Sequence, residues 1–87
     1  MKHVRKMILS HCPHCRNAAR IEEKLVAENP AFAAVEIEVV DEALHPEIAD
    51  TLDYYYVPCY FVDGVKIVEG VPDEDKIRSV FTAALDA

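Results

Sequence analysis

Two cysteines separated by two residues, Cys12 and Cys15, are the pair in this sequence most suited to chemistry. Thiols at this spacing on a helix lie about one turn apart, so they can close a disulfide and open it again. The ring closed in this way is too small to restrict the unfolded chain much, and such a disulfide therefore adds little stability. The spacing predicts a redox-active dithiol rather than a structural crosslink.

The residues on either side of the pair predict where it lies in the fold. Residues 4–9 form a short, mostly apolar run that is typical of a buried strand. A helix is predicted over 13–28, because apolar residues recur there at helical spacing, no Gly or Pro interrupts them, and Pro13 suits the first helical position. Cys12 then becomes the N-cap, where unpaired N–H groups and the positive end of the helix dipole favour the thiolate.

Three further side chains are candidates for tuning or extending this chemistry. His14 can stabilise the Cys12 thiolate, which favours the reduced form and raises the reduction potential, and His11 can donate a hydrogen bond beside it. Cys59 has three interpretations: a small buried apolar side chain, an auxiliary thiol that exchanges with Cys12, or a ligand with Cys12 and Cys15 for a metal ion or an iron–sulfur cluster. A zinc site usually needs a second pair of Cys or His ligands, so we expect no metal.

The rest of the chain predicts a mixed sheet with helices around it. Alternating apolar and acidic residues over 35–40 indicate an edge strand, and Asp63-Gly64 joins two β-rich runs as a hairpin turn. Apolar residues from Ile77 to Leu85 form one face of a last helix. The expected elements are strands at 4–9, 35–40, 59–62 and 65–68, and helices at 13–28, 44–52 and after Asp73. This β-α-β-α-β-β-α order predicts a four-stranded α/β sheet whose first two strands are parallel.

Length and charge set limits on the class of protein. The 87 residues make one domain, 1–87, with a single small core. The net charge of −7 disfavours nucleic acids and anionic membranes as partners. No signal peptide is visible, so we expect a cytoplasmic protein. In the cytoplasm a catalytic disulfide is more usual than a structural one. We also expect a monomer.

The element order, with Cys-x-x-Cys at the first strand–helix junction, resembles the thioredoxin fold in its minimal, glutaredoxin-like form. Val57-Pro58, just before the third strand, resembles the cis-proline loop of that family, and Glu69-Gly70 lies where glutaredoxins carry a Gly-Gly pair. The resemblance covers essentially the whole chain. It implies that the Val57 backbone binds an extended substrate, with Pro58, Cys59 and Gly70 beside it.

The resemblance also implies an activity. We expect a thiol–disulfide oxidoreductase, a protein-disulfide reductase or glutaredoxin-like enzyme, whose catalytic residues are Cys12 and Cys15. Its partners would be disulfide-containing proteins or low-molecular-weight thiols, and its electrons would come from a thioredoxin-reductase-like protein or from glutathione. Beyond the redox-active disulfide no cofactor is implied. Two other functions stay open: a metal or iron–sulfur protein, and a non-catalytic module that senses the redox state.

Two departures from the family pattern shape these expectations. An acidic Glu69 is unfavourable beside an anionic tripeptide, which weakens the case for glutathione binding. The dipeptide Pro13-His14 matches that of the strongly oxidising periplasmic enzyme of bacterial disulfide formation, although this chain has no inserted helical domain. We therefore expect a reduction potential more oxidising than that of thioredoxin.

Overall fold

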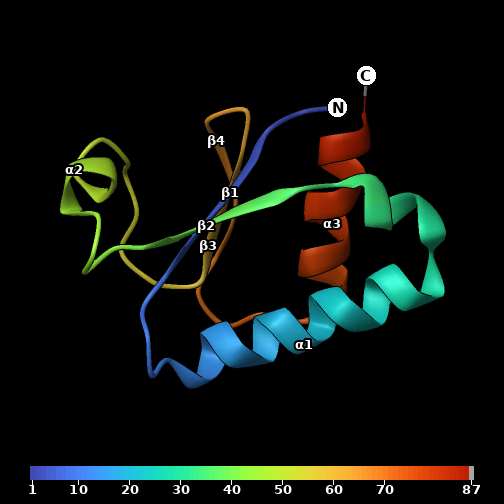
Figure 1. The fold of residues 1–87 in the computed structure, drawn as a ribbon, viewed down its shortest axis with the longest axis horizontal. Coiled ribbons are helices and arrows are strands. Elements are labelled where there is room, and N and C mark those ends of the chain that lie inside the picture. The colour runs from blue at the N-terminus through green and yellow to red at the C-terminus, as the bar shows by residue number, and fades with distance from the viewer. Residues whose placement is uncertain (87) are drawn as a thin grey trace.

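A four-stranded mixed sheet forms the centre of the structure, a computed structural model that describes residues 1–86 (Figure 1). Its strands run in the order β2-β1-β3-β4, with β1 parallel to β2 and antiparallel to β3, and β3 antiparallel to β4. The predicted fold class is confirmed. The elements are β1 (Val4–Ile8), α1 (Pro13–Glu28), the 3₁₀ helix η1 (Pro30–Ala34), β2 (Ile37–Asp41), α2 (Pro46–Ala49), β3 (Cys59–Val62), β4 (Val65–Glu69) and α3 (Glu74–Leu85). No helix of the described residues has the length and apolar character to span a membrane.

The two faces of the sheet bury different sets of side chains. Because successive side chains of a strand point to opposite faces, Tyr60 of β3 points toward α1 and α3, whereas Cys59 and Phe61 point toward α2. Helices α1 and α3 cover one face and the short α2 lies on the other (Figure 1). On the first face Phe32 of η1 stacks on Phe81 of α3, with ring centroids 4.8 Å apart. The larger core is therefore on the face that carries the two long helices.

Local sequence signals explain how the elements begin and turn. The Asp73 side chain accepts a hydrogen bond from the Lys76 N–H at 2.8 Å and so caps α3. In the β3–β4 turn Asp63 and Gly64 both have positive φ, 48° and 80°, the conformation that a two-residue hairpin turn needs. The hairpin predicted from Asp-Gly is confirmed.

The second helix is much shorter than predicted. We expected it over 44–52, but α2 covers only Pro46–Ala49, and Leu44 precedes it with 74% of its surface exposed. After Ala49 the chain closes i→i+3 bonds, from Thr51 N–H to Ile48 and from Leu52 N–H to Ala49, and the Thr51 hydroxyl donates to the same Ile48 carbonyl. These bonds replace the i→i+4 ladder and end the helix.

Several smaller differences from the prediction remain. Strand β1 ends one residue early, at Ile8, and β2 and β4 end one residue late, at Asp41 and Glu69. The edge strand begins at Ile37 rather than at residue 35, because Val35 caps η1 through a hydrogen bond from its N–H to the Phe32 carbonyl. Its position at the edge of the sheet is confirmed. Leu85, predicted on the buried face of the last helix, is 37% exposed, whereas Ala84 beside it is fully buried.

Candidate active site

Cys12 and Cys15 lie where β1 ends and α1 begins. Cys12 is the N-cap of α1, with extended backbone, and its Sγ accepts a hydrogen bond from the Cys15 N–H at 3.2 Å. Pro13 occupies the first turn, as predicted from its missing N–H. Before Cys12, His11 adopts a left-handed backbone with φ of 65°, which turns the chain from the strand into the helix. Both cysteines are free thiols in this structure.

The two thiols have different surroundings. Cys12 is partly exposed, whereas only 6% of Cys15 is exposed. Burial raises the pKa of the Cys15 thiol to about 11, and its hydrogen bond with Cys12 acts in the same direction. The Leu9 backbone and the Lys6 ammonium partly oppose this rise. Cys15 is therefore protonated near neutral pH. Because Cys15 is also buried, Cys12 is the accessible sulfur of the pair.

A buried polar network lies on the α1 face of the sheet near the pair. Lys6 Nζ is 2.6 Å from Glu22 Oε2, and the Tyr60 hydroxyl donates to the same oxygen at 2.5 Å. The Lys6 side chain is 4% exposed and that of Glu22 16%. These two residues line a hollow of about 350 Å³ together with both cysteines of the pair. Sequence reasoning missed the network, and the available signal was a lysine inside a strand expected to be buried.

A groove of about 440 Å³ lies beside the loop that contains Val57 and Pro58. Its lining residues are His14, Tyr56, Val57, Glu69, Gly70, Val71 and Lys76. The Val57–Pro58 peptide bond is cis, and the Pro58 carbonyl accepts a hydrogen bond from the Gly70 N–H at 3.0 Å. Among the described residues the Val57 peptide groups, its N–H and C=O, have no backbone hydrogen-bond partner.

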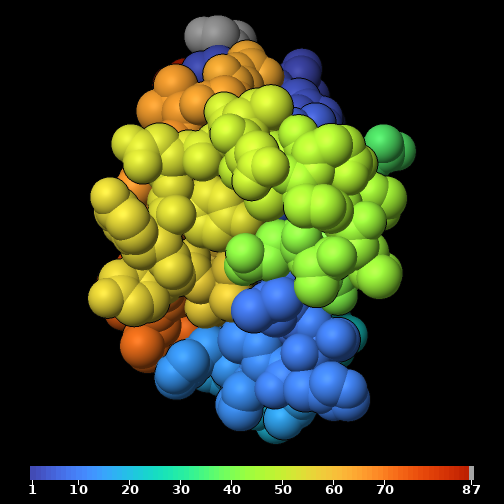
Figure 2. Space-filling view, turned by 90° about the vertical axis from the view of Figure 1, so that its left-hand side faces the viewer, coloured from blue at the N-terminus to red at the C-terminus, as the bar shows by residue number. Residues whose placement is uncertain are grey.

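Figure 2 shows how the two segments that carry these residues meet on the surface. The end of β1 and the start of α1 (blue, at the bottom) lie directly against the segment from β2 to β3 (green to yellow), although the two are far apart in sequence. Of the predicted site residues, His14, Val57 and Gly70 line the groove, whereas His11 lines the hollow with Cys12.

Cys59 lies at the start of β3 and is fully buried. Burial raises the pKa of its thiol to about 12, and the charge of Glu69 acts in the same direction. Within the described residues, no three His, Cys, Asp or Glu side chains are placed to hold a metal ion. This environment fits a small buried apolar side chain, since burial and a raised pKa make a thiol unreactive.

The three consecutive tyrosines divide between core and surface. Tyr54 packs edge-on against Phe61, with ring centroids 6.1 Å apart. Tyr55 and Tyr56 are 84% and 69% exposed, and Tyr56 lines the groove. Tyr56 therefore borders the groove, whereas Tyr54 belongs to the core.

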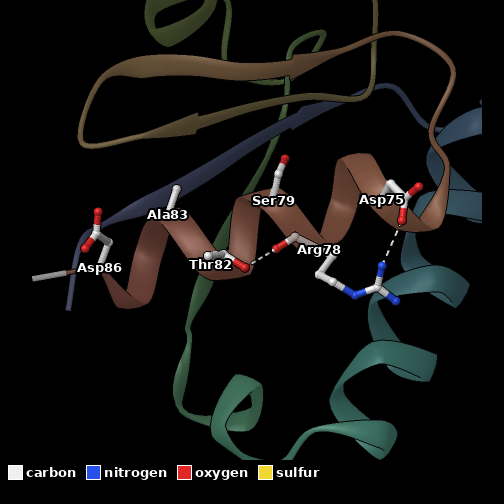
Figure 3. A pocket seen from close by; sticks show the side chains of 6 residues that line it. All are labelled: Asp75, Arg78, Ser79, Thr82, Ala83 and Asp86. Carbon is white, nitrogen blue, oxygen red and sulfur yellow. Dashed lines mark hydrogen bonds and ion pairs between the residues drawn. The ribbon is translucent and has the colours of Figure 1, made fainter.

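A third hollow, on the outer side of α3, has no such chemistry (Figure 3). It measures about 440 Å³, and the side chains of Asp75, Arg78, Ser79 and Thr82 bond within the helix. Arg78 pairs with Asp75 at 2.9 Å, and the Thr82 hydroxyl donates to the Arg78 carbonyl at 3.0 Å. The hollow contains no cysteine or histidine.

Comparison with known proteins agrees with this geometry. The family model described as "Thioredoxin domain" matches residues 3–82. The chain belongs to this thioredoxin family. Fasciola hepatica thioredoxin is similar in structure, with a TM-score of 0.66 and 27% identity over 93% of this chain and 78% of its own. Malassezia sympodialis thioredoxin (Mala s 13) shares the fold, with a TM-score of 0.58 and 22% identity over 93% of this chain and 72% of its own. No curated protein matches the sequence. As a thioredoxin-family domain, the chain has the general character of a thiol–disulfide oxidoreductase.

Proposed function

We propose that this thioredoxin-family protein reduces or exchanges disulfides of extended peptide segments through the Cys12–Cys15 pair. The observation that carries the proposal is the contrast between the two thiols: one is accessible at a helix N-terminus, and the other is buried one turn later. An accessible sulfur can attack a substrate, whereas a buried one reacts only with what its neighbour holds.

The reaction proceeds in two exchanges. The Cys12 thiolate attacks one sulfur of a substrate disulfide, forms a mixed disulfide and releases the other substrate sulfur as a thiolate, which takes up a proton. Cys15 then loses its proton and attacks the Cys12 sulfur, and the second substrate thiolate leaves and is protonated. The substrate gains two electrons and two protons, and the protein is left with the Cys12–Cys15 disulfide. A reductase or a low-molecular-weight thiol such as glutathione returns the two electrons.

The surroundings of Cys15 support the second step. Its thiol must ionise to attack, and the Lys6 ammonium lowers its pKa against the effect of burial. Lys6 and Glu22 line the same hollow as Cys15. Of this pair, the Lys6 ammonium favours the thiolate of Cys15, in the same direction as the hydrogen bond of the Leu9 backbone.

The groove supports an extended peptide as the substrate. An extended backbone can pair with the free N–H and C=O of Val57 as an added strand, and the exposed ring of Tyr56 provides an apolar wall. His14 borders the same groove, where it would lie beside the bound disulfide.

We propose that His14, His11 and Pro13 make the reduction potential of the Cys12–Cys15 couple more oxidising than that of thioredoxin. We also propose that the protein works in the cytoplasm as a monomer.

Two cysteine substitutions test the mechanism. We expect Cys12→Ser to abolish reduction of a fluorescently labelled peptide disulfide, and Cys15→Ser to accumulate a covalent mixed disulfide that mass spectrometry detects. Cys59→Ala is the matched control, because it removes a thiol that is buried away from the surface. Full turnover in both the Cys12 and the Cys15 variant would contradict the proposal. Loss of turnover in Cys59→Ala, together with a metal ion bound to the unaltered protein, would favour a metal protein instead.

A further inference from the structure

One charged side chain at the groove is directed toward the protein rather than toward a ligand. Glu69, the last residue of β4, accepts hydrogen bonds at Oε2 from the backbone N–H groups of Tyr55 and Tyr56, the latter at 2.9 Å. Its other oxygen, Oε1, accepts from Lys66 Nζ at 2.9 Å. The Glu69 side chain is 19% exposed. Both oxygens are therefore engaged by donors of the protein itself.

The two N–H groups belong to the segment that leads into Val57 and Pro58. Immediately after Glu69, the Gly70 N–H donates to the Pro58 carbonyl at 3.0 Å. The consecutive residues Glu69 and Gly70 thus hold this segment on both sides of Val57 through three backbone groups. The Gly70 backbone has φ of 86°, which favours glycine at this position.

Tyr55 and Tyr56 have few contacts of their own, although Tyr54 and Val57 on either side pack against the core and Pro58 is fully buried. Tyr55 and Tyr56 are mostly exposed, so burial of their rings contributes little to holding their backbone. Residues 50–58 contain no helix or strand that would supply a regular ladder of hydrogen bonds. The hydrogen bonds to Glu69 are charge-assisted, and such bonds are about twice as strong as neutral ones.

The carboxylate stays ionised over the whole physiological range. The Lys66 ammonium, followed by the two backbone N–H donors, lowers the pKa of Glu69 to about 2. The negative charge of Glu69 is thus neutralised by the Lys66 ammonium and stabilised by the N–H groups of Tyr55 and Tyr56.

We propose that Glu69 is a positioning residue that clamps the Tyr55–Tyr56 backbone, so that the Val57 peptide groups face an extended substrate in a fixed orientation. The inference rests on the proposed function, because it assigns Glu69 a role in binding the same peptide. A bound strand loses affinity when the edge that it pairs with is mobile, since ordering that edge then opposes binding.

The simpler alternative is a surface ion pair between Glu69 and Lys66 with no effect on the loop. The two are separable, because Lys66→Met removes the ion pair and leaves the carboxylate on both N–H groups. Glu69→Ala removes everything, whereas Glu69→Gln keeps one carbonyl oxygen that can accept from the two amides. Glu36→Ala, at an exposed residue outside the site, is the control for loss of one negative charge.

The experiment combines amide exchange by NMR with kinetics on the labelled extended peptide disulfide. In Glu69→Ala we expect the Tyr55 and Tyr56 amides to exchange about tenfold faster. We expect KM for the peptide to rise about fivefold while kcat changes less than about twofold. Glu69→Gln and Lys66→Met should keep amide exchange and KM close to those of the unaltered protein. Glu36→Ala should change neither quantity. A thermal melt of each variant confirms that it is folded.

Three results would overturn the inference. They are unchanged exchange of both amides in Glu69→Ala, faster exchange with an unchanged KM, and a Lys66→Met variant as impaired as Glu69→Ala. The exchange measurement needs no turnover, so it distinguishes the two proposals. If the unaltered protein reduces no peptide disulfide, the proposed function fails, and the positioning role fails with it even where the exchange result shows a clamp.

Discussion

The two thiols of the Cys12–Cys15 pair differ in reactivity because one helical turn separates an exposed position from a buried one. The N-cap residue lies at the end of the helix, where its side chain reaches solvent, while the residue three positions later points into the protein. Cys59, on β3, shares the burial of Cys15, and the charge of Glu69 raises its pKa further while Lys66 acts in the opposite direction. Reactivity at this scale is set by burial and by nearby charge.

Alkylation of the reduced protein measures this difference. With iodoacetamide at pH 7.5, we expect one adduct, on Cys12, because the pKa values of Cys15 and Cys59 are raised to about 11 and about 12. Peptide mapping by mass spectrometry locates the adduct, and a sample in denaturant should take up three. Rapid modification of Cys59 in the folded protein would show that its thiol is more accessible than the structure indicates.

The pair itself was predictable from the sequence, but its surroundings were not. Cys-x-x-Cys between a strand pattern and a helix pattern is a local signal, and Pro13 marks the start of the helix in the same few residues. The contact between Lys6 and Glu22 spans 16 residues, and that between Glu22 and Tyr60 spans 38. Nothing in the periodicity of either segment relates one to the other. Charged residues in such patterns are interpreted as exposed until the tertiary structure shows a partner.

At the scale of elements, the Lys6–Glu22–Tyr60 network joins β1, α1 and β3. Lys6 on β1 lies opposite Tyr60 on β3 in the antiparallel register, and Glu22 reaches both from the helix above. Lys6 also lies 5.5 Å from the centre of the Tyr60 ring. The network therefore fixes where α1, and with it the Cys12–Cys15 pair, lies on the sheet.

Substitutions of Lys6 and Glu22 should have strongly non-additive effects on stability. We expect Lys6→Met or Glu22→Leu alone to lower the free energy of unfolding by about 3 kcal/mol, because each leaves one buried charge without its partner. The double variant should lose much less, since it leaves no unpaired charge. Urea unfolding of the reduced proteins measures all three. Equal, additive losses would mean that the two side chains do not interact as the structure shows.

The elements that matched the prediction have strong local signals, and those that did not depend on competition between hydrogen bonds. The Asp63-Gly64 turn and the start of α1 at Pro13 follow from backbone preferences of single residues. The early end of α2 depends on whether Thr51 bonds back to Ile48, which apolar spacing does not reveal. The cavity beside Val57 depends on how distant segments pack, so the sequence indicated its residues only through family resemblance.

For the molecule as a whole, several buried acids stay protonated in the fold at pH values where they ionise in the unfolded chain. The ordinary pKa of a cysteine thiol is 9.0, against about 11 for Cys15 and about 12 for Cys59 in the folded protein. Burial raises the pKa of Tyr54 to about 12, and it also raises the pKa of Tyr60. Above pH 9 the unfolded state therefore releases protons that the folded state retains, and this favours unfolding.

From neutral pH upward, the stability of the reduced protein should accordingly be constant to about pH 9 and fall between pH 9 and 12. Urea midpoints measured at intervals across this range test the expectation. Formation of the Cys12–Cys15 disulfide removes the contribution of Cys15, and Cys59→Ala removes that of Cys59, so each should make the decline shallower. An identical decline in all three forms would assign it to the tyrosines alone.

The hydrogen bond from the Lys2 N–H to the Ala84 carbonyl, at 2.9 Å, has a practical consequence. It brings the two ends of the chain together at the start of β1, whereas Cys12 follows the other end of that strand. Figure 1 shows the N-terminus beside the end of α3, away from the beginning of α1. A surface tether or a fluorescent reporter attached at either end would point away from the groove. The domain can thus be immobilised on an electrode or a bead with its reactive sulfur facing the solution.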